Sequence, residues 1–257
     1  LATLPVEGVT LSEMQEMTIA LLRSGADINQ MNAVRKHLDV IKGGGLLRLA
    51  APAAVSALVL SDVVGNHLDV IASGPTYPDT TTFTQALEVV KRARVSGVIP
   101  VSILDYLEKG TKGQIPETVR PGDAMAVKAN HMIIGSNLES CQAAVQKARE
   151  IGFYAELVTT NLVGEARETG KSLAKIAKER LDLPRPYVLV FGGETTVTIT
   201  GSGKGGRNQE VALGALKRMV EQSGTVLITL ATDGEDGPTD AAGAVVDDTS
   251  LSRANQL

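Results

Sequence analysis

The chain has few of the residues on which several common kinds of site depend. It contains one cysteine, Cys141, which excludes an internal disulfide bond and a zinc site built on cysteines. Its three histidines, His37, His67 and His131, show no spacing typical of metal ligands. Tryptophan is absent and aromatic residues make up 3% of the chain, so a surface on which nucleic-acid bases stack is not expected.

Charge and hydropathy argue against nucleic acid and a membrane as partners. The formal net charge is -4, which indicates no basic face for nucleic acid. No apolar run approaches the roughly 20 residues of a membrane-spanning helix. The sequence therefore predicts a protein that binds neither nucleic acid nor a membrane.

The length allows one large domain or two ordinary ones. The chain has 257 residues, of which 43% are hydrophobic and 21% charged, enough apolar content for a packed core. It begins at Leu1 without a methionine and has no recognisable signal at its end, so we expect it to be a piece of a longer protein. Glycines and prolines gather over residues 109–123, which is typical of a linker. We therefore predict two domains, residues 1–118 and residues 119–257.

Apolar periodicity predicts alternating strands and helices, most regularly after the linker. A capping-box pattern at Thr10 and Glu13 begins a helix that ends near Gly25. Further helices are predicted over residues 29–41, 84–94, 101–108, 138–151, 165–181 and 208–222, and strands over residues 56–60, 131–134, 153–159, 187–191, 195–200 and 225–230. This alternation favours an α/β fold with parallel sheets. The strand over 195–200 alternates polar and apolar residues, so we expect it to be half-exposed and antiparallel, across a turn at Gly192 and Gly193.

The most informative segment is a glycine-rich loop between a strand and a helix. Glycines crowd together over residues 201–206, and Lys204 and Arg207 lie among and just after them. Glycine lets the backbone turn its N–H groups toward a ligand, and the start of the following helix carries a partial positive charge. The pattern predicts a site for a phosphate or a carboxylate.

Two other interpretations of this loop stay open. It is not a Walker A loop, because no Lys-Ser or Lys-Thr closes it, but residues 201–206 satisfy GxGxxG and Asp233 ends the next strand. A dinucleotide site is therefore a rival, although a half-exposed preceding strand and two cations fit it poorly. A flexible hairpin without a ligand is the remaining alternative.

Two clusters of polar residues and one loop could carry chemistry. Acids gather over residues 233–240 after an apolar strand, where they could hold Mg²⁺ or accept a proton from a hydroxyl, although ordinary turn chemistry explains at least one of them. On the helix over 29–41, Asn32 and Lys36 share a face with Arg35 slightly to one side; a solvated helix face is the simpler interpretation. Asp62 ends a strand before a glycine- and proline-containing loop, which is a weak signal on its own.

These segments together resemble the type II glycerate kinase family, whose C-terminal part is called the MOFRL domain. The resembling stretches, in order, are NAVRKHLDVIKGG, LSDVVGNHLDVIASGPTYPD, FGGETTVTITGSGKGGRNQEVAL and ATDGEDGPTDAAGA. The resemblance implies two Rossmann-like α/β domains with the active site in the cleft between them. It implies a cytoplasmic enzyme that phosphorylates D-glycerate to 2-phosphoglycerate with ATP and Mg²⁺, and a homodimer is one possible assembly.

Site residues follow partly from the resemblance and partly from placement. The catalytic candidates are Lys36, Asp62, Arg207 and Asp233. The candidates for binding glycerate or nucleotide are Asn32, Arg35, Ser73, Gly74, Gly192, Gly193, Glu194, Gly203, Lys204, Gly205, Gly206 and Asn208. The candidate Mg²⁺ ligands are Asp233 and Asp236.

The chain also departs from the family pattern. It has Gly65-Asn66-His67 where the family usually has Gly-Asp-Pro. The family has a catalytic lysine in a region before the position of Leu1 and a further stretch beyond Leu257, so we expect residues 1–257 alone to be inactive. The alternatives to the kinase are an NAD(P)-dependent hydroxypyruvate reductase that uses residues 201–206 and a non-catalytic fragment that binds ligand without turnover.

Overall fold

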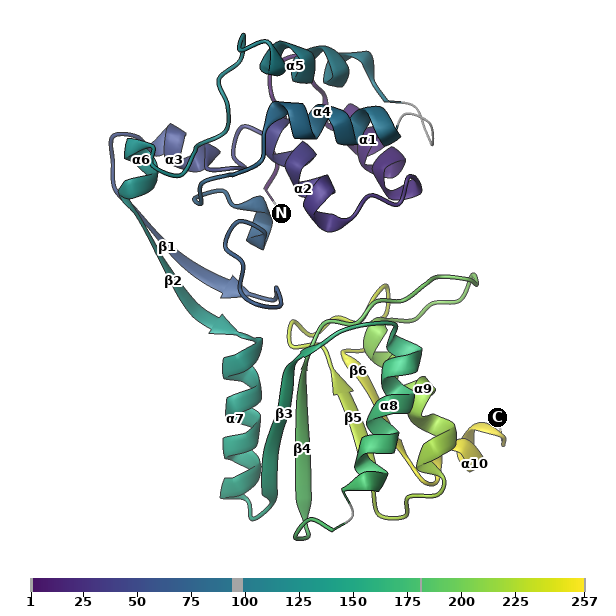
Figure 1. The fold of residues 1–257 in the computed structure, drawn as a ribbon. Coiled ribbons are helices and arrows are strands. Elements are labelled where there is room, and N and C mark those ends of the chain that lie inside the picture. Colours follow the sequence, from purple (N-terminus) through teal and green to yellow (C-terminus); the bar gives the residue numbers. More distant parts are fainter. Residues whose placement is uncertain (1, 94–98, 181, 257) are drawn as a thin grey trace. The chain divides into compact units, whose positions relative to one another are not determined.

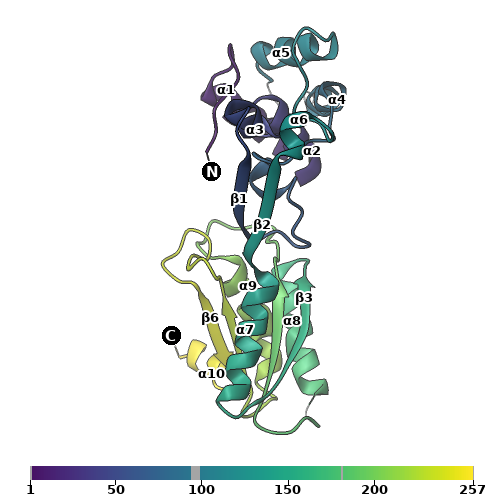
Figure 2. The same ribbon diagram turned by 90° about the vertical axis from the view of Figure 1, so that its left-hand side faces the viewer.

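The protein is a mixed α/β structure, as predicted. The computed structural model describes residues 2–93, 99–180 and 182–256. The chain divides into two compact units, Leu1–Ser136 (unit 1) and Asn137–Leu257 (unit 2), and each is described by itself (Figures 1 and 2). Among the helices of the described residues, none is both long enough and apolar enough to cross a membrane.

Unit 1 is a cluster of helices with one pair of strands. Its elements are α1 (Leu11–Arg23), α2 (Ile28–His37), α3 (Gly45–Ala50), β1 (Val55–Ser61), the 3₁₀ turn η1 (Ile71–Ser73), α4 (Phe83–Ala93), α5 (Val101–Thr111), α6 (Ala124–Val127) and β2 (Ala129–Ser136). The capping box that begins α1 is formed: the Thr10 hydroxyl accepts a hydrogen bond from Glu13 N, and the Glu13 carboxylate accepts one from Thr10 N.

The core of unit 1 lies between helices α1, α2, α4 and α5. The fully buried side chains there include Met17, Leu21, Val34, Val90 and Ile103. Along α4 the buried residues Ala86, Leu87 and Val90 follow Phe83 by three, four and seven positions, which places them on one face, so the apolar periodicity of the sequence becomes the packed interior. This core fixes the position of α2, which carries Asn32 and Lys36.

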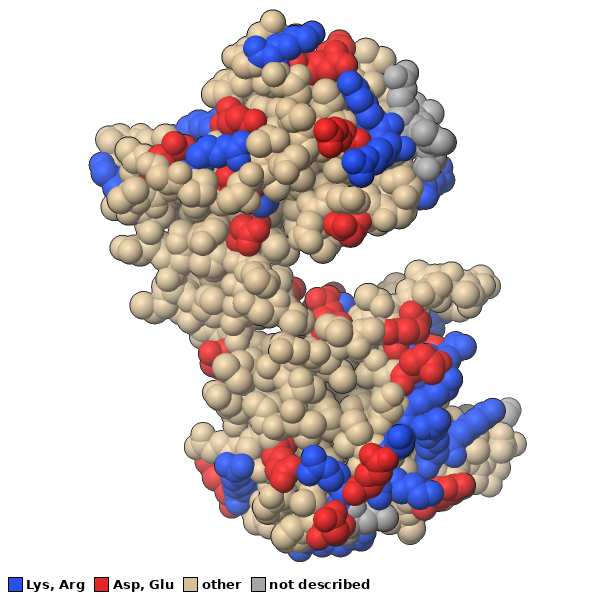
Figure 3. Space-filling view, in the orientation of Figure 1, with Lys and Arg blue, Asp and Glu red and all other residues tan. Residues whose placement is uncertain are grey.

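The strands of unit 1 form a parallel pair with one uncovered face. β1 and β2 lie side by side in both views, in a register that pairs Val55 with Ala129 and Ser61 with Ser136 (Figures 1 and 2). Every second residue of β1 is exposed, and Leu58 and Leu60 are 69% and 73% exposed. The surface over these strands is almost free of charged side chains in Figure 3.

Unit 2 contains the regular strand and helix alternation expected from the sequence. Its elements are α7 (Asn137–Glu150), β3 (Tyr154–Leu162), α8 (Ala166–Glu179), β4 (Tyr187–Gly193), α9 (Arg207–Met219), β5 (Val226–Leu230), β6 (Gly243–Asp247) and α10 (Ser250–Ala254). β3 and β4 are parallel and joined through α8, whereas β5 and β6 are antiparallel. The loops that follow β4 and β5 lie at the same end of unit 2 (Figure 1).

Glycines allow α8 and α9 to pack closely. A Cβ atom on Gly170 would lie 1.9 Å from Val211 O, and one on Gly214 would lie 2.3 Å from Arg167 O. Helix backbones that approach so closely leave no room for a side chain at either position. The contact fixes the direction of α9, whose first residue is Arg207.

Two predicted elements differ from the fold. Residues 195–200 do not form an antiparallel strand; instead a single parallel bridge joins Thr196 to Glu165, continuing the pairing of β3 with β4. The second helix was expected to run to residue 41 and to stop at the glycines that follow, but it ends at His37. A separate short helix, α3, begins at the last of those glycines. The helices predicted over 84–94 and 165–181 are present, although residues 94 and 181 lie outside the described residues.

The units divide after Ser136, whereas the sequence predicts a boundary after residue 118. Two long-range interactions keep residues 119–136 in unit 1. Val119 N donates to Gly43 O at 3.1 Å, and Asp79 N donates to Val119 O at 2.7 Å. β2 then pairs with β1, so the glycine- and proline-rich segment is packed against unit 1 and does not behave as a free linker.

Candidate functional site

In unit 1 the structure brings together two predicted binding residues that lie far apart in sequence. The Ser73 hydroxyl donates to Asn32 Oδ1 at 3.0 Å, and both residues are buried. Asn32 lies on α2 and Ser73 at the end of η1, so the helix face predicted from spacing is covered by a loop and is not solvated.

The turn over residues 72–74 has an uncommon backbone conformation. Ala72, Ser73 and Gly74 have φ values of 52°, 63° and 60°, in the left-handed region that side chains other than glycine seldom adopt. Gly43 N and Gly44 N hold it by donating to Ser73 O at 3.1 Å and to Gly74 O at 2.8 Å. Strained turns of this kind concentrate at functional sites, which supports Ser73 and Gly74 as candidates.

Lys36 forms a buried ion pair. Its Nζ lies 3.2 Å from Asp79 Oδ1, with the lysine side chain 5% exposed and the aspartate fully buried. Asp79 also accepts hydrogen bonds from Thr81 N at 3.1 Å and from the Thr118 hydroxyl at 3.0 Å. Burial alone would raise the pKa of Asp79, but the charge of Lys36 and the hydrogen bonds from Thr81 hold that pKa below its usual value. The carboxylate therefore stays charged and fixes the lysine.

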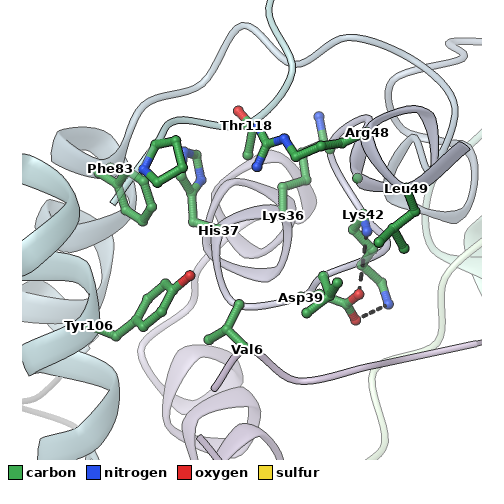
Figure 4. A pocket seen from close by; sticks show the side chains of 14 residues that line it. Val6, Lys36, His37, Asp39, Lys42, Arg48, Leu49, Phe83, Tyr106 and Thr118 are labelled. Carbon is green, nitrogen blue, oxygen red and sulfur yellow. Dashed lines mark hydrogen bonds and ion pairs between the residues drawn. The ribbon is translucent and has the colours of Figure 1, made fainter. Parts of the chain in front are cut away.

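Beside this ion pair lies a cavity of about 140 Å³, wholly within unit 1. Lys36, Arg48, Tyr106 and Thr118 are among the residues that line it (Figure 4). Burial raises the pKa of Tyr106, an effect that the charge of Arg48 partly opposes, so its phenol stays protonated at neutral pH. The Lys36 side chain thus reaches a space that a small molecule could enter.

Two other predicted residues of unit 1 lie outside this group. Arg35 is on α2 and partly exposed, and Asp62 is exposed immediately after β1. The described contacts do not connect either side chain to Lys36 or Ser73. Their proposed roles rest on the sequence alone.

In unit 2 the glycine-rich loop over residues 201–206 (the glycine loop) is exposed and open. A Cβ atom placed on Gly201, Gly203 or Gly205 would meet nothing within 4 Å, and Lys204 is exposed. At its end Arg207 Nη1 contacts Glu194 Oε1, which follows β4. Both side chains of this pair are about half exposed, at 51% and 48%, so the guanidinium is accessible to a ligand.

The start of α9 is occupied by a carboxylate of the protein. Asn208 N and Gln209 N donate to Asp236 at 2.9 and 2.8 Å, and the side-chain amides of the same two residues donate to it at 3.2 and 3.1 Å. The amides of Asn208 and Gln209 are therefore already engaged by Asp236, so an anion bound at this helix start would have to use the glycine loop and its side chains instead. Asp236 also engages the side chain of Asn208, another predicted binding residue, because Asn208 Nδ2 donates to Asp236 Oδ1.

The two glycines that end β4 have packing roles. A Cβ atom on Gly192 would lie 2.3 Å from Asn137 Oδ1 and 2.4 Å from Cys141 Sγ, and one on Gly193 would lie 2.1 Å from Leu162 O. They lie at the end of β4 and do not form the hairpin turn expected there. Their small size lets α7 and β3 approach β4.

The two candidate Mg²⁺ ligands differ. Asp233 is exposed in the loop after β5, and its Oδ1 accepts a hydrogen bond from Glu235 N at 3.2 Å. A single exposed carboxylate fits the way in which Mg²⁺ is held together with nucleotide phosphates. Asp236 does not fit, because it is buried and four N–H groups already occupy its oxygens. Within the described ranges there is no group of three or more His, Cys, Asp or Glu side chains placed to hold a metal ion.

Sequence reasoning missed Asp79 and Gln209. Asp79 lies in one of the stretches that carry the family resemblance, in the TYPD segment, but no local spacing connects it to Lys36, 43 residues away. Gln209 follows the glycine loop and was expected only to continue the helix. A charged residue beside an otherwise apolar or proline-rich turn is the only signal that could have drawn attention to Asp79.

Comparison with known proteins matches both halves of the chain. The family described as Domain of unknown function (DUF4147) matches residues 1–108, and the MOFRL family matches residues 187–257. The chain is 45% identical to the D-glycerate 2-kinase of Thermotoga maritima, covering 95% of this chain and 56% of that protein. It is 40% identical to the glycerate 2-kinase of Pyrococcus horikoshii, covering 98% of this chain and 58% of that protein.

A further relative and a solved structure extend the match. The chain is 34% identical to the glycerate kinase of Macaca fascicularis, covering 94% of this chain and 71% of that protein. The crystal structure of glycerate kinase from Thermotoga maritima superposes with a TM-score of 0.82 at 42% identity, covering 99% of this chain and 59% of that one. The chain thus spans little more than half the length of the two microbial relatives. It belongs to the glycerate kinase family.

Proposed function

We propose that the protein of which this chain is part transfers a phosphoryl group from ATP to D-glycerate and forms 2-phosphoglycerate. The observation that carries the proposal is the placement of Arg207. Its accessible guanidinium lies at the start of α9, between the open glycine loop and the end of β4, in a chain similar to named glycerate 2-kinases. An arginine fork there suits bidentate binding of a carboxylate or a phosphate.

Charge neutralisation and positioning are what this reaction requires from its protein. The transferred phosphoryl group carries charge on its peripheral oxygens, so catalysis rests on fixed cations and donors more than on covalent chemistry. We assign the binding of nucleotide phosphates to Lys204 and the exposed amides of the glycine loop. Arg207 clamps a carboxylate or phosphate of the reactants.

In unit 1, polar groups on α2 and the strained turn suit a small hydroxy acid. Asn32 and Ser73 are held rigidly by their mutual hydrogen bond, and Lys36 brings a fixed positive charge to the wall of the cavity. We assign to them the hydrogen bonding of glycerate and the stabilisation of charge on the transferring group. Arg35 and Asp62 are proposed to assist in the binding of glycerate and in the stabilisation of that charge.

Asp233 is the candidate acid of unit 2. Its exposed carboxylate suits either the general base that accepts the glycerate hydroxyl proton or the ligand that would hold Mg²⁺. Bound Mg²⁺ would supply charge neutralisation on the nucleotide phosphates. Asp236 has no part in that binding, since its oxygens are engaged by α9.

The assay combines the full-length protein with ATP, Mg²⁺ and D-glycerate, and couples the product to enolase without a mutase. We expect ADP formation together with an enolase signal, because enolase accepts 2-phosphoglycerate. ADP without the enolase signal would point to the 3-phospho product. Oxidation of NADH with hydroxypyruvate, and no ADP, would replace the kinase by a reductase. Residues 1–257 should be assayed in parallel.

Replacing Arg207 by alanine tests its assigned role. If Arg207 clamps charge in the transition state, we expect Arg207→Ala to lower kcat/KM at least about 100-fold. The matched control is Arg218→Ala, at the other end of α9, where the guanidinium donates to Lys171 O. Near-normal turnover by Arg207→Ala would remove this residue from the mechanism.

A further inference from the structure

Asp236 is the one buried carboxylate in an otherwise exposed acidic loop, residues 231–242. It is 2% exposed, whereas Asp233, Glu235 and Asp240 in the same loop are exposed. Oδ1 accepts hydrogen bonds from the backbone and side-chain nitrogens of Asn208, and Oδ2 accepts them from those of Gln209. Each carboxylate oxygen therefore has two donors, which fills its ordinary acceptor capacity.

The hydrogen-bond donors around Asp236 favour the charged form of its carboxyl group. Burial would raise the pKa of this carboxyl, but the hydrogen bonds from Asn208 and Gln209 hold the pKa below its usual value. A carboxylate at a helix start is also stabilised by the partial positive charge of the unpaired amides. The group therefore caps α9 from a loop 27 or 28 residues away in the chain.

Two glycines let the acidic loop and the glycine loop touch. A Cβ atom on Gly206 would lie 2.2 Å from Asp236 Cγ, and one on Gly237 would lie 2.3 Å from Gly205 O. Gln209 Nε2 also links α9 to the acidic loop by donating a hydrogen bond to the Thr239 hydroxyl at 2.9 Å. Backbone contact and hydrogen bonds thus join the two loops on both sides of the carboxylate.

We propose that Asp236 is a positioning residue, which locks the acidic loop onto the start of α9 and thereby sets Arg207 and Asp233 relative to each other. The role in catalysis rests on the proposed kinase activity, whereas the lock itself does not. It follows that nucleotide phosphates bind to the glycine loop and Lys204, and not to the backbone amides of Asn208 and Gln209. It also follows that Asp236 contributes nothing directly to metal binding.

The variant Asp236→Asn tests the lock with almost no change of shape. An asparagine side chain has one acceptor oxygen and one NH₂ group. In either orientation of this amide, the NH₂ group faces the N–H donors of Asn208 or those of Gln209, and the hydrogen bonds of that residue are lost. We expect hydrogen exchange at the Asn208 or Gln209 amide of residues 1–257 to accelerate at least about tenfold, as for the loss of a charge-assisted hydrogen bond. Gln209→Ala keeps both backbone donors and the Asp236 carboxylate, so at the two backbone amides it should give a smaller acceleration than Asp236→Asn does. It is the second variant in case Asp236→Asn does not fold.

Kinetics of the full-length protein separate positioning from metal binding. Asp236→Asn should lower kcat at least about tenfold while the Mg²⁺ concentration for half-maximal rate changes less than about twofold. Asp182→Asn, an exposed aspartate of unit 2 remote from both loops, is the matched control and should leave both values unchanged. Unchanged exchange at both amides would overturn the lock. Retained kcat with a Mg²⁺ requirement raised about tenfold or more would overturn it in favour of a metal ligand. If the wild-type protein does not phosphorylate glycerate, the proposed function fails, and the exchange result still decides the lock.

Discussion

Single residues in this protein are fixed by charges that lie far away in sequence. The clearest case in unit 1 is Lys36, whose ammonium group faces the buried carboxylate of Asp79. Two charges removed from water are tolerated only while they stay paired and hydrogen-bonded, and Thr81 and Thr118 supply the remaining bonds to Asp79. Lys36 is therefore preorganised at the wall of the cavity, which is what its assigned role as a fixed positive charge requires.

Removing one charge of this pair should be costly. We expect Asp79→Asn to lower the free energy of unfolding by about 3–5 kcal/mol, because it leaves the ammonium of Lys36 buried without a countercharge. Urea unfolding at neutral pH measures the change. Asp27→Asn is the matched control in the same unit: Asp27 caps α2, and asparagine caps helices equally well. A change below about 1 kcal/mol in Asp79→Asn would show that the pair is not a stabilising element.

The same pair predicts a dependence on pH. Because the pKa of Asp79 is lower in the folded state than its ordinary value of 3.8, its stabilisation is complete above that value and is lost as the pH falls through the folded-state pKa. The difference in unfolding free energy between the wild type and Asp79→Asn should therefore shrink as the pH is lowered below about 4. Unfolding curves over this range, with Asp27→Asn alongside, check it. A difference that stays constant would contradict the assignment of the pair.

At the scale of elements, the position of α9 decides where Arg207 lies. The helix is held at its start by Asp236 and along its length by close packing on α8 through Gly170 and Gly214. Helix propensity alone favours alanine over glycine by up to about 1 kcal/mol in both places. The tertiary contact is what requires glycine.

Gly170→Ala should therefore destabilise unit 2. A Cβ atom 1.9 Å from Val211 O forces the helices apart, and overpacking of this kind costs about 1–3 kcal/mol, more than the helix propensity of alanine returns. Gly201→Ala is the matched control, since its Cβ would meet nothing within 4 Å and no stability loss is expected. Urea unfolding followed by circular dichroism measures both. Equal stabilities of the two variants would show that α8 and α9 adjust freely.

Across the whole molecule, the most unusual feature is uncovered apolar strand surface. Parallel strands usually have both faces covered, yet the parallel pair of β1 and β2 exposes Leu58, Leu60, Met132 and Ile134. A contiguous apolar surface on a folded chain marks a place where other protein or ligand binds. When residues 1–257 are studied on their own, we expect this surface to be exposed to water.

A dye that binds apolar surface tests this expectation. We expect residues 1–257 to increase the fluorescence of ANS while keeping the circular dichroism of a folded protein. The double variant Leu58→Thr/Ile134→Thr should reduce the signal, because threonine keeps strand propensity and removes apolar area. Leu22→Thr, a change at an exposed leucine of α1, is the control and should leave the signal nearly unchanged. An ANS signal that is insensitive to the strand variant would contradict the assignment of the surface.

The sequence by itself determined the local features of this protein. The capping box at Thr10, most helix and strand positions and the exposed glycine loop follow from patterns within a few residues, because caps and apolar periodicity act over one or two turns. It failed at residues 195–200, where the alternating pattern predicted an antiparallel strand and a tertiary contact with Glu165 prevailed.

The tertiary structure alone decided which polar groups meet. Ser73 reaches Asn32 across 41 residues, Asp79 reaches Lys36 across 43 and Asp236 reaches Asn208 across 28. No periodic pattern encodes such separations, so a cluster of acids after a strand could not reveal that Asp233 stays exposed while Asp236 is buried against α9. The physical reason is that a buried carboxylate must find its donors in the folded chain, and those donors come from wherever the fold brings unpaired amides.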